Sequence, residues 1–478
     1  MSGDFVPISI KREEIIVNTK YFKNVFIITI VILIIVGIYV VYIKNNIKQN
    51  SVQVQNKEIV ISKEIIIGIT NFDTINPVLT KNLEIQHITK LIYEPLINIT
   101  QDFNTKPEIA EECSKINDLT YLIKLDENKR WSNGKPVTVE DVEYTIKSIK
   151  DSDSIYKENV KQIENIEKVN EDTFKVHLRE PVDFFEYLLC FPIIKENPQN
   201  PNIPMHTGKY QITNINENQI IIEGEEQTII IKILKNTTEL YNDFTRKNVD
   251  LIITGNTNYE KYIGNIGFEE KKIIGREFYY ISCENIDNTE TRKTLNSNIN
   301  KEKLVYDLYN RKYIVVDFPL EYGSYLNKEK TIKNVETTSN QETFTLFTKS
   351  ENIEIAKKIK EQLEEKNIKI KIQNYQNTKA DLLLKKEIVP ITPEIRQYFK
   401  NEQTKERIRK TVLIENKEIL KEEYNKIIDD YYNEIPFISL YFNTYIILHT
   451  NTLKGDFSGN WYNMFYNINT WYKIIWIL

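Results

Sequence analysis

The sequence of 478 residues is poor in glycine and cysteine, and each shortage narrows the possible functions. Its 13 glycines include no GxxxxGK[ST] or GxGxxG arrangement, so a nucleotide-type phosphate loop is not indicated. The three cysteines, Cys113, Cys190 and Cys283, are far apart and odd in number. This favours buried thiols over a disulfide framework or a metal site.

Histidines and uncompensated charge are also scarce. There are four histidines, and no HExxH, GxSxG or Cys–His signature accompanies them. We therefore expect no metal, no cofactor and no catalytic residues. The net charge is only -5 and no basic patch is interleaved with aromatic residues, which argues against nucleic-acid binding.

The N-terminal region contains a long hydrophobic run instead. Residues 25–43, VFIITIVILIIVGIYVVYI, are 19 positions without a charge, enough to cross a hydrocarbon core as one helix. A buried soluble helix is seldom apolar on every face, and a cleaved signal peptide would need a small-residue site after the run. Positive residues flank both ends, so the positive-inside rule leaves the orientation open.

The rest of the chain, in which hydrophobic residues are frequent, has α/β patterns. Residues 65–69 form a short apolar run that ends in the turn-rich loop NFDTINP, which predicts a buried strand. Residues 343–373 predict a strand, a helix with a stripe of apolar residues, and a second strand; ADLLL (380–384) predicts another. The predicted helix stripe consists of Ile353, Ala356, Ile359 and Leu363. Such a βαβ unit implies parallel strands.

Between these regions the sequence predicts hairpins and a well-defined helix start. Tyr121, Ile123 and Leu125 alternate, as do Phe174, Val176 and Leu178, which is typical of half-buried strands. In WSNGKPVTVEDVEYTI (131–146), Asn133-Gly134 predicts a turn, and Thr138 with Asp141 has the spacing of a capping box. We interpret this stretch as structural, with Trp131 as a core residue.

Several motifs, taken in order, resemble one family. RWSNGKPVTVEDVEYTIKSI is similar to the characteristic segment of the family 5 extracellular solute-binding proteins, the oligopeptide-, dipeptide- and nickel-binding components of bacterial ABC importers. LIYEPLI, HTGKY, FTRKNVDLII, REFYYISCEN and EIPFISLYFNTYIILHTNTLKG resemble further family segments in the same order. The resemblance covers about residues 63–478.

The resemblance implies an α/β fold with a mixed α+β subdomain: a two-lobed, periplasmic-binding-protein-like fold with a hinge, preceded by one transmembrane helix. We expect a cytoplasmic tail over residues 1–24, the span over 25–43 and a linker over 44–62. Lobe I would comprise 63–274 and 437–478, with a hairpin-rich subdomain at about 100–205. Lobe II would comprise 275–436.

The function implied is binding without turnover. A membrane-anchored, extracytoplasmic protein would close its lobes around a peptide-like or other small solute and deliver it to ABC permease subunits. The alternative keeps the fold but not the transport: a sensor or interaction protein whose ligand binding is altered or lost.

The resemblance also implies ligand-binding residues. These are Asn76, Tyr93, Tyr279, Tyr280, Asn285, Thr392 and Tyr441. Packing is an equally good explanation for any single tyrosine, and Asn285 could cap a turn. Thr392-Pro393 stands where the peptide binders have the Asp-Pro whose carboxylate takes the ligand's ammonium. A threonine hydroxyl cannot neutralise an ammonium, and Glu394 could replace the aspartate only after a rearrangement of the loop.

Overall fold

The computed structural model describes residues 30–42, 44, 58–264, 266–320, 323–327, 343–374, 379–414 and 416–477. The chain divides into two compact units. The first comprises Met1–Val60 with Ile475–Leu478, and the second comprises Ile61–Ile474.

In the first unit, residues 30–42 are helical. Within the described part of the chain, no helix combines the length and the apolar character that crossing a membrane requires. The predicted span reaches beyond this helix, because residues 25–29 and 43 lie outside the described residues. The predicted tail and most of the predicted linker also lie outside them, and strand β1 (Glu58–Ser62) follows.

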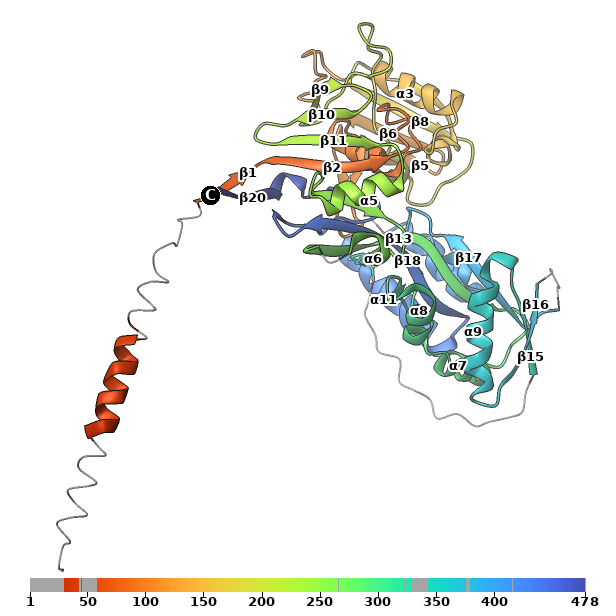
Figure 1. Ribbon diagram of the computed structural model, residues 1–478. Coiled ribbons are helices and arrows are strands. Elements are labelled where there is room, and N and C mark those ends of the chain that lie inside the picture. The colour runs from red at the N-terminus through yellow and green to blue at the C-terminus, as the bar shows by residue number, and fades with distance from the viewer. Residues whose placement is uncertain are drawn as a thin grey trace, which may run out of the picture. The chain divides into compact units, whose positions relative to one another are not determined.

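One large mixed sheet organises the second unit (Figure 1). Its strands, in spatial order, are β16 (Lys369–Gln373), β15 (Thr343–Phe347), β17 (Leu382–Ile388), β13 (Phe268–Cys283), β18 (Phe437–Thr450), β12 (Leu251–Thr254), β2 (Glu64–Thr70), β11 (Thr228–Leu234), β10 (Gln219–Glu223) and β9 (Gln211–Ile215). One further short strand, β14 (Ile314–Val315), pairs with β18. By the predicted bounds, which define the two lobes below, the strands from β12 to β9 fall in lobe I and β17, β15 and β16 fall in lobe II. The strand predicted at residues 65–69 is β2, whose Ile65, Ile67 and Ile69 are fully buried.

The long strands β13 and β18 connect the two lobes. They pair antiparallel from Phe268↔Thr450 to Ser282↔Phe437, and Figure 1 shows them side by side between the two groups of strands. The pairing is interrupted between Ile274 and Phe278. There the backbone N–H of Glu277 donates to the side-chain Oδ1 of Asn443 (2.9 Å) instead of to a strand carbonyl.

Lobe I carries a second sheet of four antiparallel strands, and the alternating strands predicted around residues 121–125 and 174–178 belong to it. The order is β5 (Ala110–Asn117), β6 (Thr120–Leu125), β8 (Thr173–Leu178) and β7 (Ile163–Lys168). The predicted alternation is confirmed, because Ile123 and Phe174 are fully buried and their neighbours two positions away are nearly so. Two shorter strands, β3 (Ile97–Ile99) and β4 (Thr105–Pro107), pair with each other, as do β19 (Leu453–Lys454) and β20 (Tyr472–Ile477).

The predicted βαβ unit is confirmed in lobe II. Strands β15 and β16 pair in parallel, and α9 (Ile353–Glu364) connects them. The buried face of α9 differs from the prediction, because Ile355 and Gln362 are buried whereas Ile353 is only half-buried. Strand β17 corresponds to the predicted ADLLL strand and is parallel to β15.

Asparagine, which is abundant in this chain, begins six of the described helices. In each, the asparagine side chain accepts a hydrogen bond from a backbone N–H of the first turn, which would otherwise lack a partner. The capped helices are α2 (Leu83–Ile88, Asn82), α5 (Thr237–Thr245, Asn236), α7 (Thr289–Asn298, Asn288), α8 (Lys301–Tyr309, Asn300), α10 (Glu402–Thr411, Asn401) and α11 (Lys417–Glu434, Asn416). The remaining helices are α3 (Val139–Asp151), α4 (Lys157–Val160), α6 (Glu260–Ile263) and the 3-10 turns η1 (Thr89–Leu91), η2 (Phe185–Leu189), η3 (Ser350–Asn352), η4 (Arg396–Tyr398) and η5 (Ile468–Thr470).

Candidate ligand-binding cleft

A cavity of about 590 Å³ lies where both lobes meet the interruption in β13. Lobe I contributes residues of α2, η1, α4 and η2, and lobe II contributes the loop after β17. The lining residues are Leu83, Gln86, His87, Lys90, Ile155, Tyr156, Glu158, Asn159, Leu188, Cys190, Arg276, Glu277, Ile388, Pro390, Ile391, Thr392, Tyr445, Trp461 and Tyr462. We call this cavity the cleft.

Lys90 is a cation in the cleft without a counter-ion. Its Nζ lies 3.9 Å from the ring centroid of Tyr462 and 6.0 Å from that of Tyr156. Within the described part of the chain, no carboxylate or hydrogen-bond acceptor pairs with it. Burial lowers the pKa of the Lys90 ammonium from 10.5 to about 8, because the charged form loses solvation.

Two buried N–H groups of the cleft also lack partners. Nδ1 of His87 accepts the backbone N–H of Met464 (3.3 Å), so the proton of the neutral imidazole is on Nε2. Neither Nε2 of His87 nor Nε1 of Trp461 has a hydrogen-bond partner. Burial, with the nearby charge of Lys90, lowers the pKa of His87 to about 3, so that its ring is neutral.

Three side chains form a stack at the edge of the cleft, and two of them, Arg276 and Trp461, line it. The guanidinium carbon of Arg276 lies 4.5 Å from the ring centroid of Trp461, and Trp461 stacks on Phe103 with centroids 5.8 Å apart. Nε of Arg276 also donates to the carbonyl of Val389 (2.8 Å), which follows β17 in lobe II. Arg276 therefore connects the interruption in β13 to walls of the cleft from both lobes.

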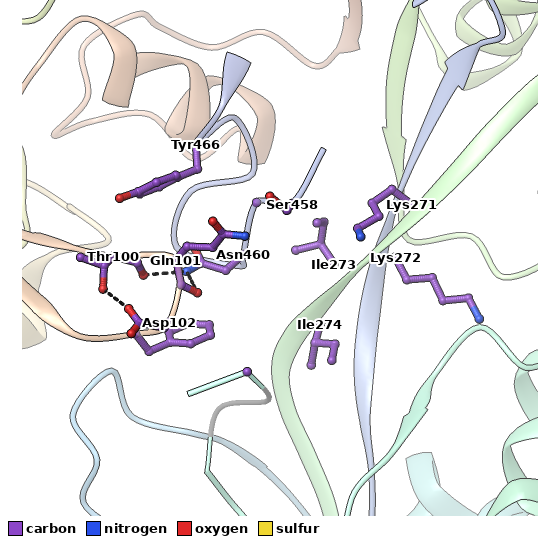
Figure 2. A pocket seen from close by; sticks show the side chains of 13 residues that line it. Thr100, Gln101, Asp102, Lys271, Lys272, Ile273, Ile274, Ser458, Asn460 and Tyr466 are labelled. Carbon is purple, nitrogen blue, oxygen red and sulfur yellow. Dashed lines mark hydrogen bonds between the residues drawn. The ribbon is translucent and has the colours of Figure 1, made fainter. Parts of the chain in front are cut away.

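A second cavity, of about 640 Å³, lies on the Phe103 side of this stack (Figure 2). It lies between the loop from Thr100 to Phe103 and β13, and its polar side chains are mostly satisfied. Nδ2 of Asn460 donates to the carbonyls of Thr100 (3.1 Å) and Gln101 (3.3 Å). Lys272, which points away from that loop in Figure 2, donates to the carbonyl of Arg311 (2.7 Å). Among the described residues that line these two cavities, the buried N–H donors without partners are thus found in the cleft.

Of the seven predicted ligand-binding residues, only Thr392 lines the cleft. Glu394, considered above as a substitute for the missing aspartate, does not line it. The Oε1 of Glu394 accepts the backbone N–H of Arg396 (2.7 Å), and its other oxygen pairs with the Arg396 guanidinium (2.6 Å). The same guanidinium nitrogen of Arg396 contacts Oδ2 of Asp183 in lobe I (2.5 Å).

Tyr279 and Tyr441 lie together, but in a hydrophobic core formed mainly by residues of lobe II. Their ring centroids are 4.8 Å apart, and the hydroxyl of Tyr441 lies 3.1 Å from that of Tyr309. Tyr280 lies among other core residues, and its hydroxyl donates to Glu387 (2.7 Å).

The other three predicted residues have structural contacts elsewhere. Nδ2 of Asn285 donates to the carbonyl of Ala380 (2.6 Å), at the edge of a separate cavity of about 560 Å³ in lobe II. Tyr93 is almost fully buried and donates to the carbonyl of Pro204 (3.2 Å). Asn76 stabilises its own turn by accepting the backbone N–H of Val78 (3.0 Å).

The sequence reasoning did not identify Lys90, His87, Arg276 or Trp461. A weak signal was present for two of them, because Lys90 directly precedes LIYEPLI and Arg276 begins REFYYISCEN. A charged residue next to an otherwise apolar motif is a better indicator of a site than one more tyrosine.

The sequence model of the bacterial extracellular solute-binding proteins, family 5 (middle region), matches residues 104–407. The chain belongs to this family. A relative from Brucella melitensis, itself named only as a binding protein, is 22% identical over 248 residues, which are 43% of this chain and 40% of that protein. The chain thus spans about two fifths of the length of the curated relatives it matches.

Solved structures agree with the two-lobed periplasmic-binding-protein fold. The murein tripeptide binding protein MppA, in its unliganded open form, has a TM-score of 0.72 at 14% identity, covering 87% of this chain and 98% of that one. NikZ from Campylobacter jejuni, in complex with Ni(L-His), has a TM-score of 0.54 at 17% identity, covering 87% and 100%. At these identities the likeness establishes the fold.

Proposed function

We propose that this family 5 protein is a membrane-anchored, extracytoplasmic solute-binding protein that delivers peptide-like solutes to an ABC importer. The observation that carries the proposal is the cleft of about 590 Å³, which both lobes line next to the interruption in β13. A cavity of this size between two lobes is typical of a small-ligand site. No covalent change to the solute is part of the proposal.

Binding would proceed by closure of the lobes. We propose that residues 275–436 move as lobe II against residues 63–274 and 437–478, with the hinge at Gly275–Glu277. Gly275 has no side chain, and two of the three hinge residues, Arg276 and Glu277, line the cleft. A bend at this point would therefore change the shape of the cleft directly.

The walls of the cleft suit an extended solute with apolar and polar parts. Tyr156, Tyr445 and Trp461 offer aromatic surfaces, and Thr392 offers a hydroxyl. This composition resembles that of small-molecule sites, in which a few polar groups orient a ligand against apolar walls. That one structural relative is a tripeptide binder supports peptide-like solutes.

Membrane anchoring is supported by the character of the N-terminal helix. From Ile30 to Tyr42 every residue except Gly37 is apolar or aromatic, and these side chains are between 41% and 65% exposed. A helix that is apolar on all sides has no favourable position in water. We propose that the apolar run of residues 25–43, to which this helix belongs, anchors the protein in the membrane, with lobes I and II outside the cytoplasm.

The experiment that tests this function is calorimetric titration of the full-length protein in lipid nanodiscs with defined mixtures of three- to five-residue peptides. We expect saturable binding and recovery of intact peptide. Trp461→Ala should abolish binding, whereas Tyr466→Ala, in the second cavity, should leave it nearly unchanged. No heat signal with any mixture, and no small molecule bound in native mass spectra, would instead favour the alternative of a sensor that has lost its ligand.

A further inference from the structure

We propose that the cleft selects solutes by a carboxylate group, which Lys90 binds together with the N–H groups of His87 and Trp461. The inference rests on the function proposed above and specifies its substrate class. Solutes that carry a free carboxylate, and need no free amine, would be preferred over neutral or cationic ones.

The charges that line the cleft support this selectivity. Two carboxylates are present, and each has a lysine nearby: Glu158 pairs with Lys161 (3.1 Å) and Glu277 with Lys386 (3.5 Å). Lys90 has no such counter-ion and lies over the ring of Tyr462 instead. The uncompensated charge in this part of the cleft is therefore positive, and an anionic ligand would neutralise it.

The hydrogen-bonding groups beside Lys90 are complementary to an acceptor. Nε2 of His87 and Nε1 of Trp461 are buried N–H donors without partners. Buried donors rarely lack a hydrogen-bond partner in the protein unless a ligand or a water molecule supplies one. A carboxylate has two oxygens with about four lone-pair positions, enough to accept bonds from the ammonium and both N–H groups. A single carboxylate therefore has enough acceptor positions for all three protein groups.

At Thr392, where the family's ammonium-binding aspartate would stand, the cleft wall offers no carboxylate to an ammonium. Thr392 is neutral, and Glu394 is already paired with Arg396. A free amino terminus placed near Thr392 would lose its solvation without gaining a carboxylate partner. At the position of Thr392 the cleft therefore disfavours a free amine, while Lys90 attracts a carboxylate.

The test uses the full-length protein and two matched sets of probes, N-acetylated tripeptides with a free C-terminal carboxylate and the same tripeptides as C-terminal amides. We expect the acids to bind at least tenfold more tightly. Lys90→Met should reduce the affinity for the acids to that for the amides, whereas Lys90→Arg should retain part of the preference. N-acetyl tripeptide amides with an internal glutamate would show whether a side-chain carboxylate is accepted as well as a terminal one.

Two further variants keep the test specific. Lys81→Met changes the net charge equally, but Lys81 pairs with Asp153 (2.8 Å) and does not line the cleft, so the preference for acids should persist. Trp461→Phe retains the ring but removes one donor, and should weaken acid binding more than amide binding. Melting temperatures establish that each variant is folded.

The outcomes separate the two proposals. Equal affinities of the wild-type protein for acids and amides, or an undiminished preference in Lys90→Met, would overturn the carboxylate site and leave the solute-binding function in place. If the wild-type protein binds neither set and carries no small molecule in native mass spectra, the solute-binding function fails, and the carboxylate site fails with it.

Discussion

The indole N–H of Trp131 donates a 2.7 Å hydrogen bond to Oδ2 of Asp141. The same carboxylate accepts the backbone N–H of Thr138 (3.0 Å) and pairs with Lys195 (2.7 Å), while Asp141 is only 4% exposed. The most regular stretch of the sequence is thus a structural connection between a turn, the start of α3 and the strand-rich core of lobe I. It contributes no residue to the cleft.

Replacing this carboxylate should destabilise the protein without affecting ligand binding. Asp141→Asn leaves Lys195 without its counter-ion and weakens two hydrogen bonds, so we expect a loss of roughly 2–4 kcal/mol in unfolding free energy. Thr138→Ala should cost roughly 0.5–2 kcal/mol, as for other helix caps. Chemical denaturation measures both, and Asp118→Asn, in an exposed ion pair, is the control. A large loss of affinity at unchanged stability would contradict a purely structural role.

The hinge also yields a prediction. A Cβ added to Gly275 would clash with the side-chain amide of Asn443, which accepts the backbone N–H of Glu277. Gly275→Ala should therefore displace Asn443 and cost about 1–3 kcal/mol in unfolding free energy.

The cost of Gly275→Ala should be smaller in an Asn443→Ala background, because the atoms that clash are then absent. Gly255→Ala is the matched control: no atom lies within 4 Å of its added Cβ, so it should be nearly neutral. Chemical denaturation measures the cost with and without the Asn443 side chain. Equal costs would show that the clash with Asn443 is not what destabilises Gly275→Ala.

The elements that are regular in sequence could be predicted, and the cleft largely could not. Alternation in β6 and β8 and the stripe of α9 identify strands and a helix because burial of one face imposes a period. The cleft is different, because Lys90, Arg276 and Trp461 come from segments about 190 residues apart. They line one cavity only in the folded protein, and no local pattern in the sequence indicates this. Tyrosines were natural candidates by composition, yet Tyr279 and Tyr441 pack against each other in the core.

The contact between Arg396 and Asp183 should influence how readily the lobes separate. Nη2 of Arg396 lies 2.5 Å from Oδ2 of Asp183 across the two lobes, and Arg396 keeps Glu394 as a second partner. Asp183→Asn should therefore change the unfolding free energy by less than about 1 kcal/mol, as for other partly exposed pairs. It should nevertheless increase the radius of gyration of the unliganded protein in small-angle X-ray scattering.

The ligand-bound form of Asp183→Asn should regain the compact dimensions of the wild-type protein, because the solute then holds the lobes together. Glu180→Gln, an exposed change three positions earlier, should have no effect on the scattering. Identical curves for the wild-type protein and Asp183→Asn without ligand would show that this pair does not restrain the lobes.

The affinity for carboxylate solutes should fall above neutral pH. The pKa of Lys90 is lowered to about 8 by burial, so its ammonium is present at pH 7 and largely deprotonated at pH 9.5 in the unliganded protein. Binding of an anion raises that pKa, so above pH 8 each binding event must take up a proton. By linkage, the affinity should decrease by up to tenfold per pH unit there, and roughly tenfold or more between pH 7 and pH 9.5.

The groups around Lys90 do not titrate in this interval. Burial lowers the pKa of His87 to about 3 and raises that of Cys190 to about 11, and it raises the pKa of Tyr156 and Tyr462 above 10. Calorimetry of an N-acetylated peptide acid in buffers with different ionisation enthalpies should show net proton uptake at pH 9 and little at pH 6.5. The amide probes and Lys90→Met should show neither the uptake nor the decline. Because a merely structural Lys90 would not couple protons to ligand binding, a pH-independent affinity for the acids would refute its role as the carboxylate-binding residue.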